Sequence, residues 1–380
     1  MAQNSEDQPS KRIAFVIPSL GDGGSNRFMI EVAKGMSALG YDVDLIAIDP
    51  SGQYANMDLG AVRPFDIGPV QLKGMTVLKA IFFLASYIRR ERPKKVMAAT
   101  TAVNVLLLLA NAITFKKTEI IVSERNPIRA SALHASRINR FYKKLIPFLY
   151  PSASSIVAVS QGVAEELIHN FGVPAVKVKV IYNPVVTDEL LKLSKEDVAD
   201  DWFGLAAQPV VVSVGRLHPQ KDYSTLIKGF AHLRKHMDAR LIILGEGRNR
   251  YEIEKLIEEL GLTDFIRLPG FAANPYAYMA RADLFAIASV YEGICNVIIE
   301  ALACGCPVVS TDCPGGGPRE ILEDGKWGHL CPVGDAKALS QSMLESLGSE
   351  RRSNELKARA SYFSYEASMA KYLQLFEGRR

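Results

Sequence analysis

Two cations stand five residues apart in the loop after a buried β-strand. The strand is expected over residues 209–215 (PVVVSVG), and the loop contains Arg216 and Lys221. A guanidinium can form paired hydrogen bonds with phosphate oxygens, and an ammonium adds a second positive charge. This pattern indicates a site for a diphosphate. The alternative is that both cations are ordinary solvated surface charges.

Two carboxylates with seven residues between them follow a later strand. Glu292 lies in the loop after that strand, and Asn296 is expected to cap a helix over residues 297–304. Glu300 lies about one turn into this helix, whose N-terminus favours an anion. Its carboxylate can accept hydrogen bonds from ribose hydroxyls or, as the alternative, interact with the helix dipole at the surface. Because the helix is otherwise apolar, a buried carboxylate here needs a partner.

Both loops belong to a pattern of short apolar strands that alternate with amphipathic helices. Strands are expected over residues 12–20, 42–48, 95–99, 119–124 and 154–160, and again over 209–215, 239–245, 265–270, 284–289 and 307–311. Between the two series, residues 185–208 are polar and acidic and contain no expected strand. The alternation predicts an α/β protein with two doubly wound parallel sheets. Ligands of such sheets bind at the carboxyl ends of the strands, where the motifs lie.

The composition predicts a globular protein with two domains, since 48% of the 380 residues are hydrophobic and 23% are charged. The first ten residues are polar, so we expect a frayed tail and no signal peptide. Residues 103–113 form the most apolar run. A membrane span needs about 20 such residues, so we expect a buried strand or helix there.

All five cysteines fall in the last quarter of the chain, at positions 295, 304, 306, 313 and 331. Their odd number and the lack of a signal peptide argue against a disulfide framework. The spacing of Cys304, Cys306 and Cys313 lacks the paired blocks of structural zinc sites, so no metal is expected. We expect small, half-buried thiols in a reducing cytosol.

Taken together, the motifs resemble the family-four (group 1) retaining glycosyltransferases of GT-B fold, whose signature includes two glutamates separated by seven residues. Glu292 and Glu300 reproduce that spacing, and the resemblance extends over nearly the whole chain. Further matching segments are Gly23 and Gly24 after the first strand, VIYNPV (180–185), VGRLHPQKD (214–222), LIILGEG (241–247), LPGF (268–271) and TDCPGGGPREIL (311–322).

The resemblance implies two Rossmann-like domains. Residues 1–186 would form an acceptor-side domain, and residues 187–363 would bind the nucleotide sugar. A C-terminal helix, expected over residues 365–378, would lie within a segment (364–380) that returns to the first domain.

The resemblance also implies roles for individual residues. Arg216 and Lys221 would hold the donor diphosphate, Glu300 would bind the ribose, and Glu292 would face the donor sugar. Arg216, Lys221 and Glu292 are therefore the expected catalytic residues. No metal or other cofactor is expected. Further donor contacts are expected from Gly24, Phe271, Ile294, Cys295, Asn296 and Val297.

Three departures from the family pattern concern the sugar and the acceptor. Cys295 stands where many relatives have proline, and Asn26 stands where a glutamate is common. In place of a histidine near the end of the fourth strand, this chain has SERNP (123–127). Its residues Glu124, Arg125 and Asn126 resemble the subset that acts on N-acetylhexosamine or galactose units of lipid-linked glycans. For Glu124, a salt bridge with Arg125 or a helix cap is the alternative.

A basic segment without acidic residues follows SERNP. Residues 1–190 carry 22 Lys/Arg and 16 Asp/Glu, and residues 125–164 contain no acidic residue at all. The stretch 136–150 can form an amphipathic helix with Ile138, Phe141, Tyr142, Leu145 and Leu149 on one face. Arg137, Arg140, Lys143 and Lys144 are candidates for contact with an anionic membrane surface, at about 1 kcal/mol per cation. The alternative is a core-packing helix with a solvated charged face.

The expected function is transfer of an N-acetylhexosamine or hexose from a nucleotide sugar, expected to be UDP-linked, to a lipid-linked or polysaccharide acceptor. The enzyme would act from the cytoplasm, on the inner face of the cell membrane. A non-catalytic sugar-nucleotide-binding protein is the alternative. A dinucleotide-dependent oxidoreductase is disfavoured because neither glycine turn completes G-x-G-x-x-G. No RNA-binding motif accompanies the basic patch, so no nucleic acid is expected.

Overall fold

The chain forms two compact units, which we describe separately. The computed structural model describes residues 11–21, 24–52, 54–66, 76–115, 118–133, 136–204 and 208–378. Unit 1 comprises residues 1–159, 163–182 and 368–380, and unit 2 comprises residues 160–162 and 183–367. The sequence placed the domain boundaries at 186/187 and 363/364. The chain passes between the units at 159/160, 162/163, 182/183 and 367/368.

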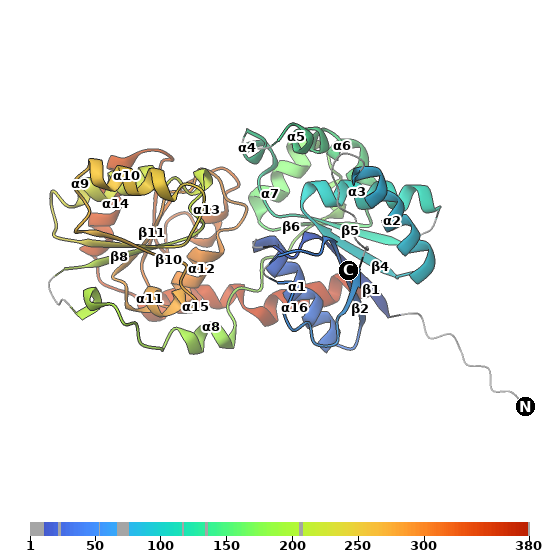
Figure 1. The fold of residues 1–380 in the computed structure, drawn as a ribbon, viewed down its shortest axis with the longest axis horizontal. Helices are drawn as coiled ribbons and strands as arrows, with labels where there is room; N and C mark the ends of the chain where they lie inside the picture. The colour runs from blue at the N-terminus through green and yellow to red at the C-terminus, as the bar shows by residue number, and fades with distance from the viewer. Residues whose placement is uncertain are drawn as a thin grey trace, which may run out of the picture. The chain divides into compact units, whose positions relative to one another are not determined.

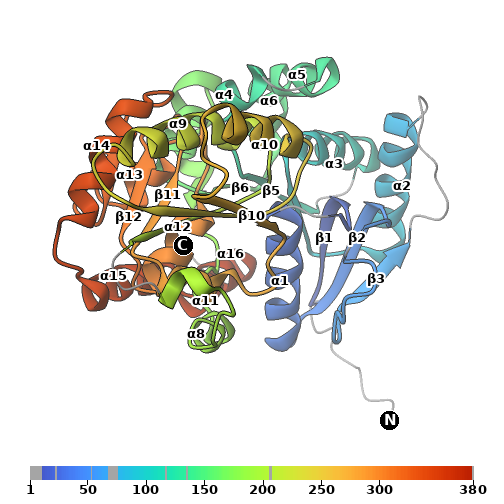
Figure 2. The ribbon, with the colours of Figure 1, turned by 60° about the vertical axis from the view of Figure 1, so that its left-hand side comes forward.

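Unit 1 is built on a seven-stranded parallel sheet with the order β3-β2-β1-β4-β5-β6-β7 (Figure 1). The strands are β1 Arg12–Ser19, β2 Asp42–Asp49, β3 Arg63–Asp66, β4 Lys95–Ala99, β5 Glu119–Glu124, β6 Ser155–Ala158 and β7 Val178–Val180. Residues 13–17 of the central strand β1 are all buried, as expected for a parallel strand covered on both faces. Figure 2 shows β1, β2 and β3 side by side at one edge of this sheet.

The helices of unit 1 are α1 Gly24–Ala38, α2 Thr76–Glu91, α3 Thr101–Thr114, α4 Ile128–Leu133, α5 Arg137–Lys144, α6 Ile146–Leu149, α7 Gln161–Glu165 from residue 163 on, and the end of α16 Tyr365–Glu377. Of these, α5 and α6 pack on α3, and α4 packs on α5. Right-handed crossovers place α1 on the face opposite α2 and α3, because β1→β2 and β3→β4→β5 run in opposite directions across the sheet. The apolar run 103–113 lies in α3.

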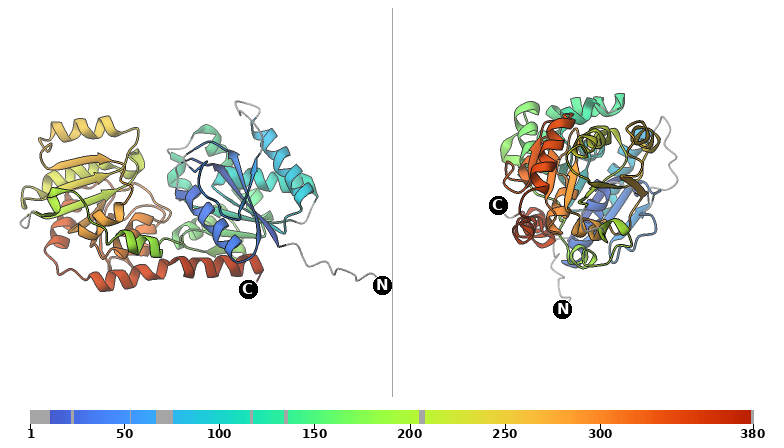
Figure 3. Two further views of the ribbon diagram at one scale, coloured as in Figure 1. Left: turned by 60° about the horizontal axis from the view of Figure 1, so that its bottom comes forward. Right: turned by 90° about the vertical axis from the view of Figure 1, so that its left-hand side faces the viewer.

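The C-terminal helix α16 packs onto the N-terminal elements of unit 1 (Figure 3). The ring of Tyr372 lies 5.7 Å from that of Phe28 in α1, and the ring of Phe376 lies 5.6 Å from that of Phe15 in β1. Lys95 at the start of β4 donates a hydrogen bond to the carbonyl oxygen of Leu375, at 3.1 Å. The end of the chain is therefore part of the core of unit 1.

Unit 2 contains a six-stranded parallel sheet with the order β10-β9-β8-β11-β12-β13. The strands are β8 Val210–Val214, β9 Arg240–Leu244, β10 Ile266–Gly270, β11 Leu284–Ile287, β12 Val308–Thr311 and β13 His329–Cys331. Its helices are α8 Asp188–Leu193, α9 Tyr223–Leu233, α10 Arg250–Glu259, α11 Pro275–Arg281, α12 Asn296–Ala303, α13 Gly317–Ile321, α14 Ala336–Leu347 and α15 Ser353–Ala360.

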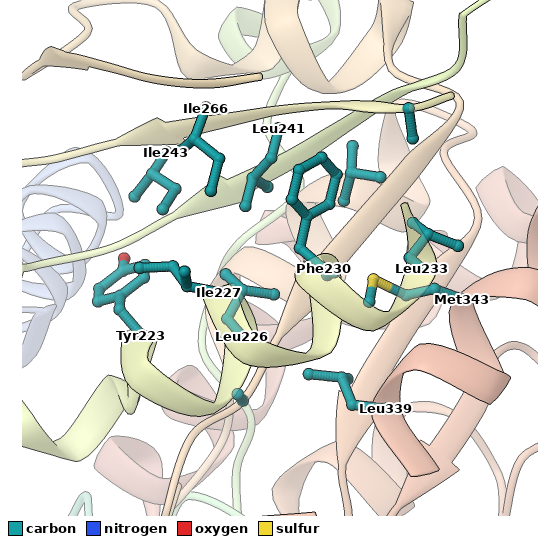
Figure 4. Close-up of a cluster of buried hydrophobic side chains, with 14 of the residues drawn as sticks. Tyr223, Leu226, Ile227, Phe230, Leu233, Leu241, Ile243, Ile266, Leu339 and Met343 are labelled. Carbon is teal, nitrogen blue, oxygen red and sulfur yellow. The ribbon is translucent and has the colours of Figure 1, made fainter. Parts of the chain in front are cut away.

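One apolar core fixes α9 and α14 on the sheet of unit 2 (Figure 4). Leu226 and Phe230 of α9 are fully buried with Leu241 and Ile243 of β9, and Leu339 of α14 joins the same cluster. Burying such a side chain stabilises the fold by about 1.5–3 kcal/mol. This core therefore holds in place the strands whose ends carry the polar motifs.

Each predicted strand is present in the structure, with ends that differ by at most two residues. The three strands that were not predicted are β3, β7 and β13, each of three or four residues. One helix start was predicted wrongly: Asn296 is the first residue of α12 and not its cap, and the cap residue is Cys295. Of the helices in the described residues, none combines the length and apolarity that a membrane span requires.

The direction of winding reverses in unit 2 between the neighbouring strands β8 and β11. The crossovers from β8 to β9 and from β9 to β10 run towards the β10 edge of the sheet. Those from β11 to β12 and from β12 to β13 run towards the β13 edge. The loops that leave β8 and β11 therefore start side by side at the carboxyl edge of the sheet, where ligands of such sheets bind. The corresponding reversal in unit 1 lies between β1 and β4.

Substitution of Gly245 tests how closely the strand-end loops pack. Gly245 has φ +145°, and a Cβ there would lie 2.0 Å from the carbonyl oxygen of Gly215. We expect Gly245→Ala to lower the free energy of unfolding by about 2–4 kcal/mol, through strain and overpacking. Denaturant unfolding measures this.

Gly261→Ala is the matched control, because Gly261 has φ +65° and open space around its Cβ position. It should cost only about 1 kcal/mol. Equal losses for the two variants would contradict the close packing of the loops.

Candidate functional site

An ion pair joins the loops that follow β8 and β11. Lys221 Nζ lies 2.6 Å from Glu292 Oε1, and the two side chains are 15% and 8% exposed. Ser289 Oγ donates a second hydrogen bond to the same carboxylate oxygen, at 2.8 Å. Two of the three expected catalytic residues are thus brought into direct contact.

The ion pair keeps Lys221 in its charged form. Burial by itself lowers the pKa of the Lys221 ammonium, but the adjacent Glu292 carboxylate outweighs this and raises the pKa above its usual value. Because a raised lysine pKa lies above 10, the ammonium carries its positive charge throughout the physiological pH range. The site therefore offers a permanent buried cation to an anionic ligand.

The loop after β8 has a conformation that holds Lys221 in place. Residues Pro219–Lys221 form a single 3₁₀ turn, and Asp222 follows in the left-handed region with φ +43°. Asp222 then caps α9: its Oδ1 accepts from the Thr225 backbone N–H, at 3.1 Å. Gln220 links this loop to the neighbouring one, since its backbone oxygen accepts from Val290 N–H, at 2.8 Å.

Arg216 differs from Lys221 in its surroundings. Its side chain is exposed, and it forms no hydrogen bond or ion pair with any residue that the structure describes. The alternative of a solvated surface charge thus fits Arg216, whereas it is wrong for Lys221. An exposed guanidinium can form paired hydrogen bonds with phosphate oxygens.

The N-terminus of α12 presents backbone donors beside Glu292. Ile294 and Cys295 are buried, and Asn296 and Val297 are half-buried. Within the described chain, the backbone N–H groups of residues 294–296 have no acceptor. Such orphan donors at a helix N-terminus bind anions or hydroxyl oxygens. Glu300, one turn further on, is half-buried.

The loop after β12 packs directly against the start of α12. Glu292 N–H donates to the Pro314 carbonyl oxygen, at 3.1 Å. A Cβ on Gly317 would lie 2.8 Å from the carbonyl oxygen of Gly293, so only glycine allows the two loops to approach this closely. The PGGG segment (314–317) therefore lies in direct contact with the loop that carries Glu292.

The remaining donor candidates, Phe271 and Gly24, are both exposed. Phe271 follows β10 and is 79% exposed, as an aromatic ring available for stacking would be. Gly24 is the exposed first residue of α1 in unit 1. Gly23 lies outside the described residues.

All five cysteines are buried, which corrects the expectation of half-buried thiols. Burial raises the pKa of the Cys304 thiol to about 12 and that of Cys295 well above its ordinary value. Among the described residues there is no group of three or more His, Cys, Asp or Glu side chains that could hold a metal ion.

In unit 1, Glu124 is buried at the end of β5 and is held by neutral donors. Thr101 Oγ1 donates to its Oε2 at 3.0 Å, Asn104 Nδ2 donates to its Oε1 at 3.1 Å, and the Tyr150 hydroxyl also donates to Oε1. Burial raises the pKa of Glu124, and these hydrogen bonds partly oppose the shift. No ion pair joins Glu124 to Arg125 within the described chain, so the salt-bridge alternative is wrong.

Arg125 points towards α1 and α16 instead. Its guanidinium carbon lies 3.7 Å from the centroid of the Phe28 ring, and Nη1 donates to Ser123 Oγ at 3.4 Å. Burial lowers the pKa of Arg125, while the neighbouring Tyr372 opposes this. Of the three acceptor-side candidates, only Asn126 is exposed.

The basic helix divides into an inner and an outer part. Tyr142 is buried, and Lys143 Nζ donates to Ser131 Oγ at 2.7 Å, so this lysine is held within unit 1. Burial lowers the pKa of Lys143. The exposed residues of α5 combine cations and one amide with apolar side chains; they are Arg137, Ile138, Asn139, Arg140, Phe141 and Lys144. Exposed Ile138 and Phe141 show that the predicted apolar face is only partly packed into the core.

Several residues of the site were not identified from the sequence. Ser289 and Gln220 fix the Lys221–Glu292 pair, and Asn183 contacts Asn296. Asn183 lies in the matching segment VIYNPV, which was the available signal. The partners of Glu124 gave no signal, because their sequence positions are 20 or more residues away.

Comparison with known proteins gives consistent matches over both units. Residues 22–189 match the model described as Glycosyltransferase Family 4, and residues 202–363 match the model described as Glycosyl transferases group 1. The N-acetylgalactosamine-N,N'-diacetylbacillosaminyl-diphospho-undecaprenol 4-alpha-N-acetylgalactosaminyltransferase of Campylobacter jejuni is 31% identical, over 93% of this chain and 96% of its own. The lipopolysaccharide core biosynthesis glycosyltransferase LpsE of Rhizobium meliloti is 26% identical over the same shares. The crystal structure of Anabaena HepE in complex with UDP has a TM-score of 0.78 and 23% identity, and covers 97% of this chain and 100% of its own.

Thiol reactivity tests the burial of the cysteines. Because all five thiols are buried and Cys295 and Cys304 have raised pKa values, we expect none to react with a chromogenic disulfide reagent at pH 8 within minutes. All five should react in denaturant, which serves as the control. A fast-reacting thiol in the native protein, abolished by Cys295→Ala, would contradict the enclosed Glu292 loop.

Proposed function

This chain belongs to glycosyltransferase family 4, and on that basis we propose that it moves an N-acetylhexosamine or hexose from a UDP-sugar to a lipid-linked or polysaccharide acceptor. Its two parallel Rossmann-like sheets have the GT-B fold, as the sequence predicted. By family it is a retaining, metal-independent glycosyltransferase. The observation that carries the proposal is the buried Lys221–Glu292 pair beside the unpaired amides of α12.

The geometry of unit 2 supports departure of a nucleoside diphosphate. Negative charge develops on the diphosphate as the glycosidic bond breaks, and preorganised cations and amides stabilise it most in a water-poor site. Lys221 offers a buried charge and Arg216 an exposed one, while residues 294–296 offer backbone N–H groups. In this proposal Glu292 orients Lys221 and faces the sugar, and Glu300 binds the ribose hydroxyls.

The choice of donor and acceptor rests on relatives. HepE was solved with UDP, and the Campylobacter relative is named for N-acetylgalactosaminyl transfer to a diphospho-undecaprenol-linked sugar. LpsE is named for lipopolysaccharide core biosynthesis. Together with SERNP, these names favour an N-acetylhexosamine and a lipid-linked glycan for this chain. Asn126 would then contact the acceptor, with Glu124 and Arg125 fixing the loop from beneath.

The outer part of α5 supports contact with an anionic membrane. Arg137, Arg140 and Lys144 lie beside exposed Ile138 and Phe141, the combination found in interfacial helices. Phe148 in the following helix α6 is also exposed. We therefore place the enzyme on the cytoplasmic face of the cell membrane. Lys143 is withdrawn from this surface, because it donates to Ile128 and Ser131.

Variants of the ion pair test the proposed transfer. Nucleotide release is measured with a panel of UDP-sugars and membrane lipid extracts as acceptors. Glu292→Gln and Lys221→Met should each lower kcat by about a hundredfold or more, since each removes a preorganised charge.

Lys228→Met, an exposed lysine in α9, is the matched control and should retain full activity. Binding of UDP-sugars without any nucleotide release would favour the non-catalytic alternative. Full activity of Glu292→Gln would contradict the assigned site.

Vesicle binding tests the membrane surface. Neutralising Arg137 and Arg140 together by glutamine should remove about 2 kcal/mol, or roughly thirtyfold in affinity for vesicles rich in phosphatidylglycerol. Co-sedimentation measures the binding, which should also weaken as salt increases. The double variant Lys235→Gln/Lys337→Gln, in unit 2, is the control for loss of two exposed charges. Unchanged binding of the Arg137/Arg140 variant would remove α5 from the proposal.

A further inference from the structure

Asn183 contacts the start of α12 from a distant part of the chain. It is the first residue of unit 2 after the chain leaves unit 1, and it is only 7% exposed. Its Nδ2 donates a hydrogen bond to Asn296 Oδ1, at 2.7 Å. Asn296 follows Cys295 and Ile294, whose backbone N–H groups are unpaired in the described chain. Asn183 is therefore attached to the part of the site that faces the donor sugar in the proposed function.

The side-chain amides of Asn183 and Asn296 form only one of the two hydrogen bonds that are possible between them. Two side-chain amides can form two reciprocal hydrogen bonds, but here only the bond from Asn183 to Asn296 exists. Asn183 Oδ1 is buried without a partner, and Asn296 Nδ2 has no acceptor among the described residues. An unsatisfied buried acceptor costs about 1–3 kcal/mol. The pair thus lacks one group that would accept from Asn296 and donate to Asn183.

We propose that Asn183 and Asn296 together bind one hydroxyl group of the transferred sugar. Such a group accepts a hydrogen bond from Asn296 Nδ2 and donates one to Asn183 Oδ1, which completes the open side. Phosphate oxygens do not fit, because they accept only and would leave Asn183 Oδ1 unpaired. The ribose does not fit either, because its expected partner Glu300 lies a turn further along α12.

This inference rests on the proposed function and adds a sugar-binding residue that none of the family motifs assigned. Asn183 acts partly through Asn296, since its N–H fixes which end of the Asn296 amide faces the sugar. A purely structural role at the chain crossing is the competing explanation. The two explanations differ in whether the effect of Asn183 depends on Asn296.

Calorimetric binding of UDP and of UDP-sugars separates the two. The sugar is the member of a panel of UDP-N-acetylgalactosamine, UDP-N-acetylglucosamine, UDP-galactose and UDP-glucose that binds the wild type most tightly. Asn183→Ala should weaken binding of that UDP-sugar by about tenfold and leave binding of UDP unchanged. Asn183→Asp keeps the size of the side chain but lacks the N–H, and it should weaken the same binding without loss of the fold.

A double-mutant cycle completes the test. The double variant Asn183→Ala/Asn296→Ala should bind the UDP-sugar no more weakly than Asn296→Ala alone, because the two residues hold one group. Asn111→Ala is the matched control: Asn111 also has a buried Oδ1 without a partner, but it lies in α3 of unit 1.

The possible failures are distinguishable. Additive losses in the cycle, an equal loss of UDP binding, or unchanged UDP-sugar binding in both Asn183 variants would overturn the inference. A wild type that binds UDP no less tightly than every UDP-sugar would also overturn it. A wild type that binds neither UDP nor any UDP-sugar would instead overturn the proposed function.

Discussion

The buried ion pair between Lys221 and Glu292 is the interaction on which the donor side of this enzyme depends. Taking two charges out of water is costly, and removing one partner of such a pair typically costs 3–5 kcal/mol because the other is left uncompensated. The pair can form only if the loops after β8 and β11 meet at one point, and the reversal of winding between these neighbouring strands provides that point. Ser289 and Gln220 then remove the freedom that two long side chains would otherwise keep.

Around this pair, the loops approach one another through backbone and not through side chains. Gly245 and Gly247 lie against the backbone of residues 215–217, and Gly317 lies against Gly293. Each contact leaves no room for a Cβ, so backbone packs directly on backbone. Electrostatic stabilisation of a leaving diphosphate depends on peptide dipoles that are held in fixed directions.

The sequence was sufficient for the elements with strong periodicity or distinctive chemistry. Buried strands such as β1 and β8 could be located because parallel strands are continuously apolar, and Lys221 and Glu292 because of their spacing. Short strands such as β13 carry too few residues for any pattern. The environment of Glu124 was also inaccessible, since Tyr150 and Thr101 reach it only through the tertiary fold. Asn296 was taken for a cap by its residue type, but its side chain is engaged by Asn183.

The return of α16 to unit 1 has a consequence for how the protein is made. Lys95 and Leu375 are joined by a hydrogen bond although 280 positions separate them, and Phe15 meets Phe376 in the same core. Closing so long a loop is entropically unfavourable until many contacts form together. On the ribosome, the first sheet must therefore wait, with the apolar surface beneath Phe15 uncovered, until the whole of unit 2 has been synthesised. The first unit to begin folding is the last that can finish.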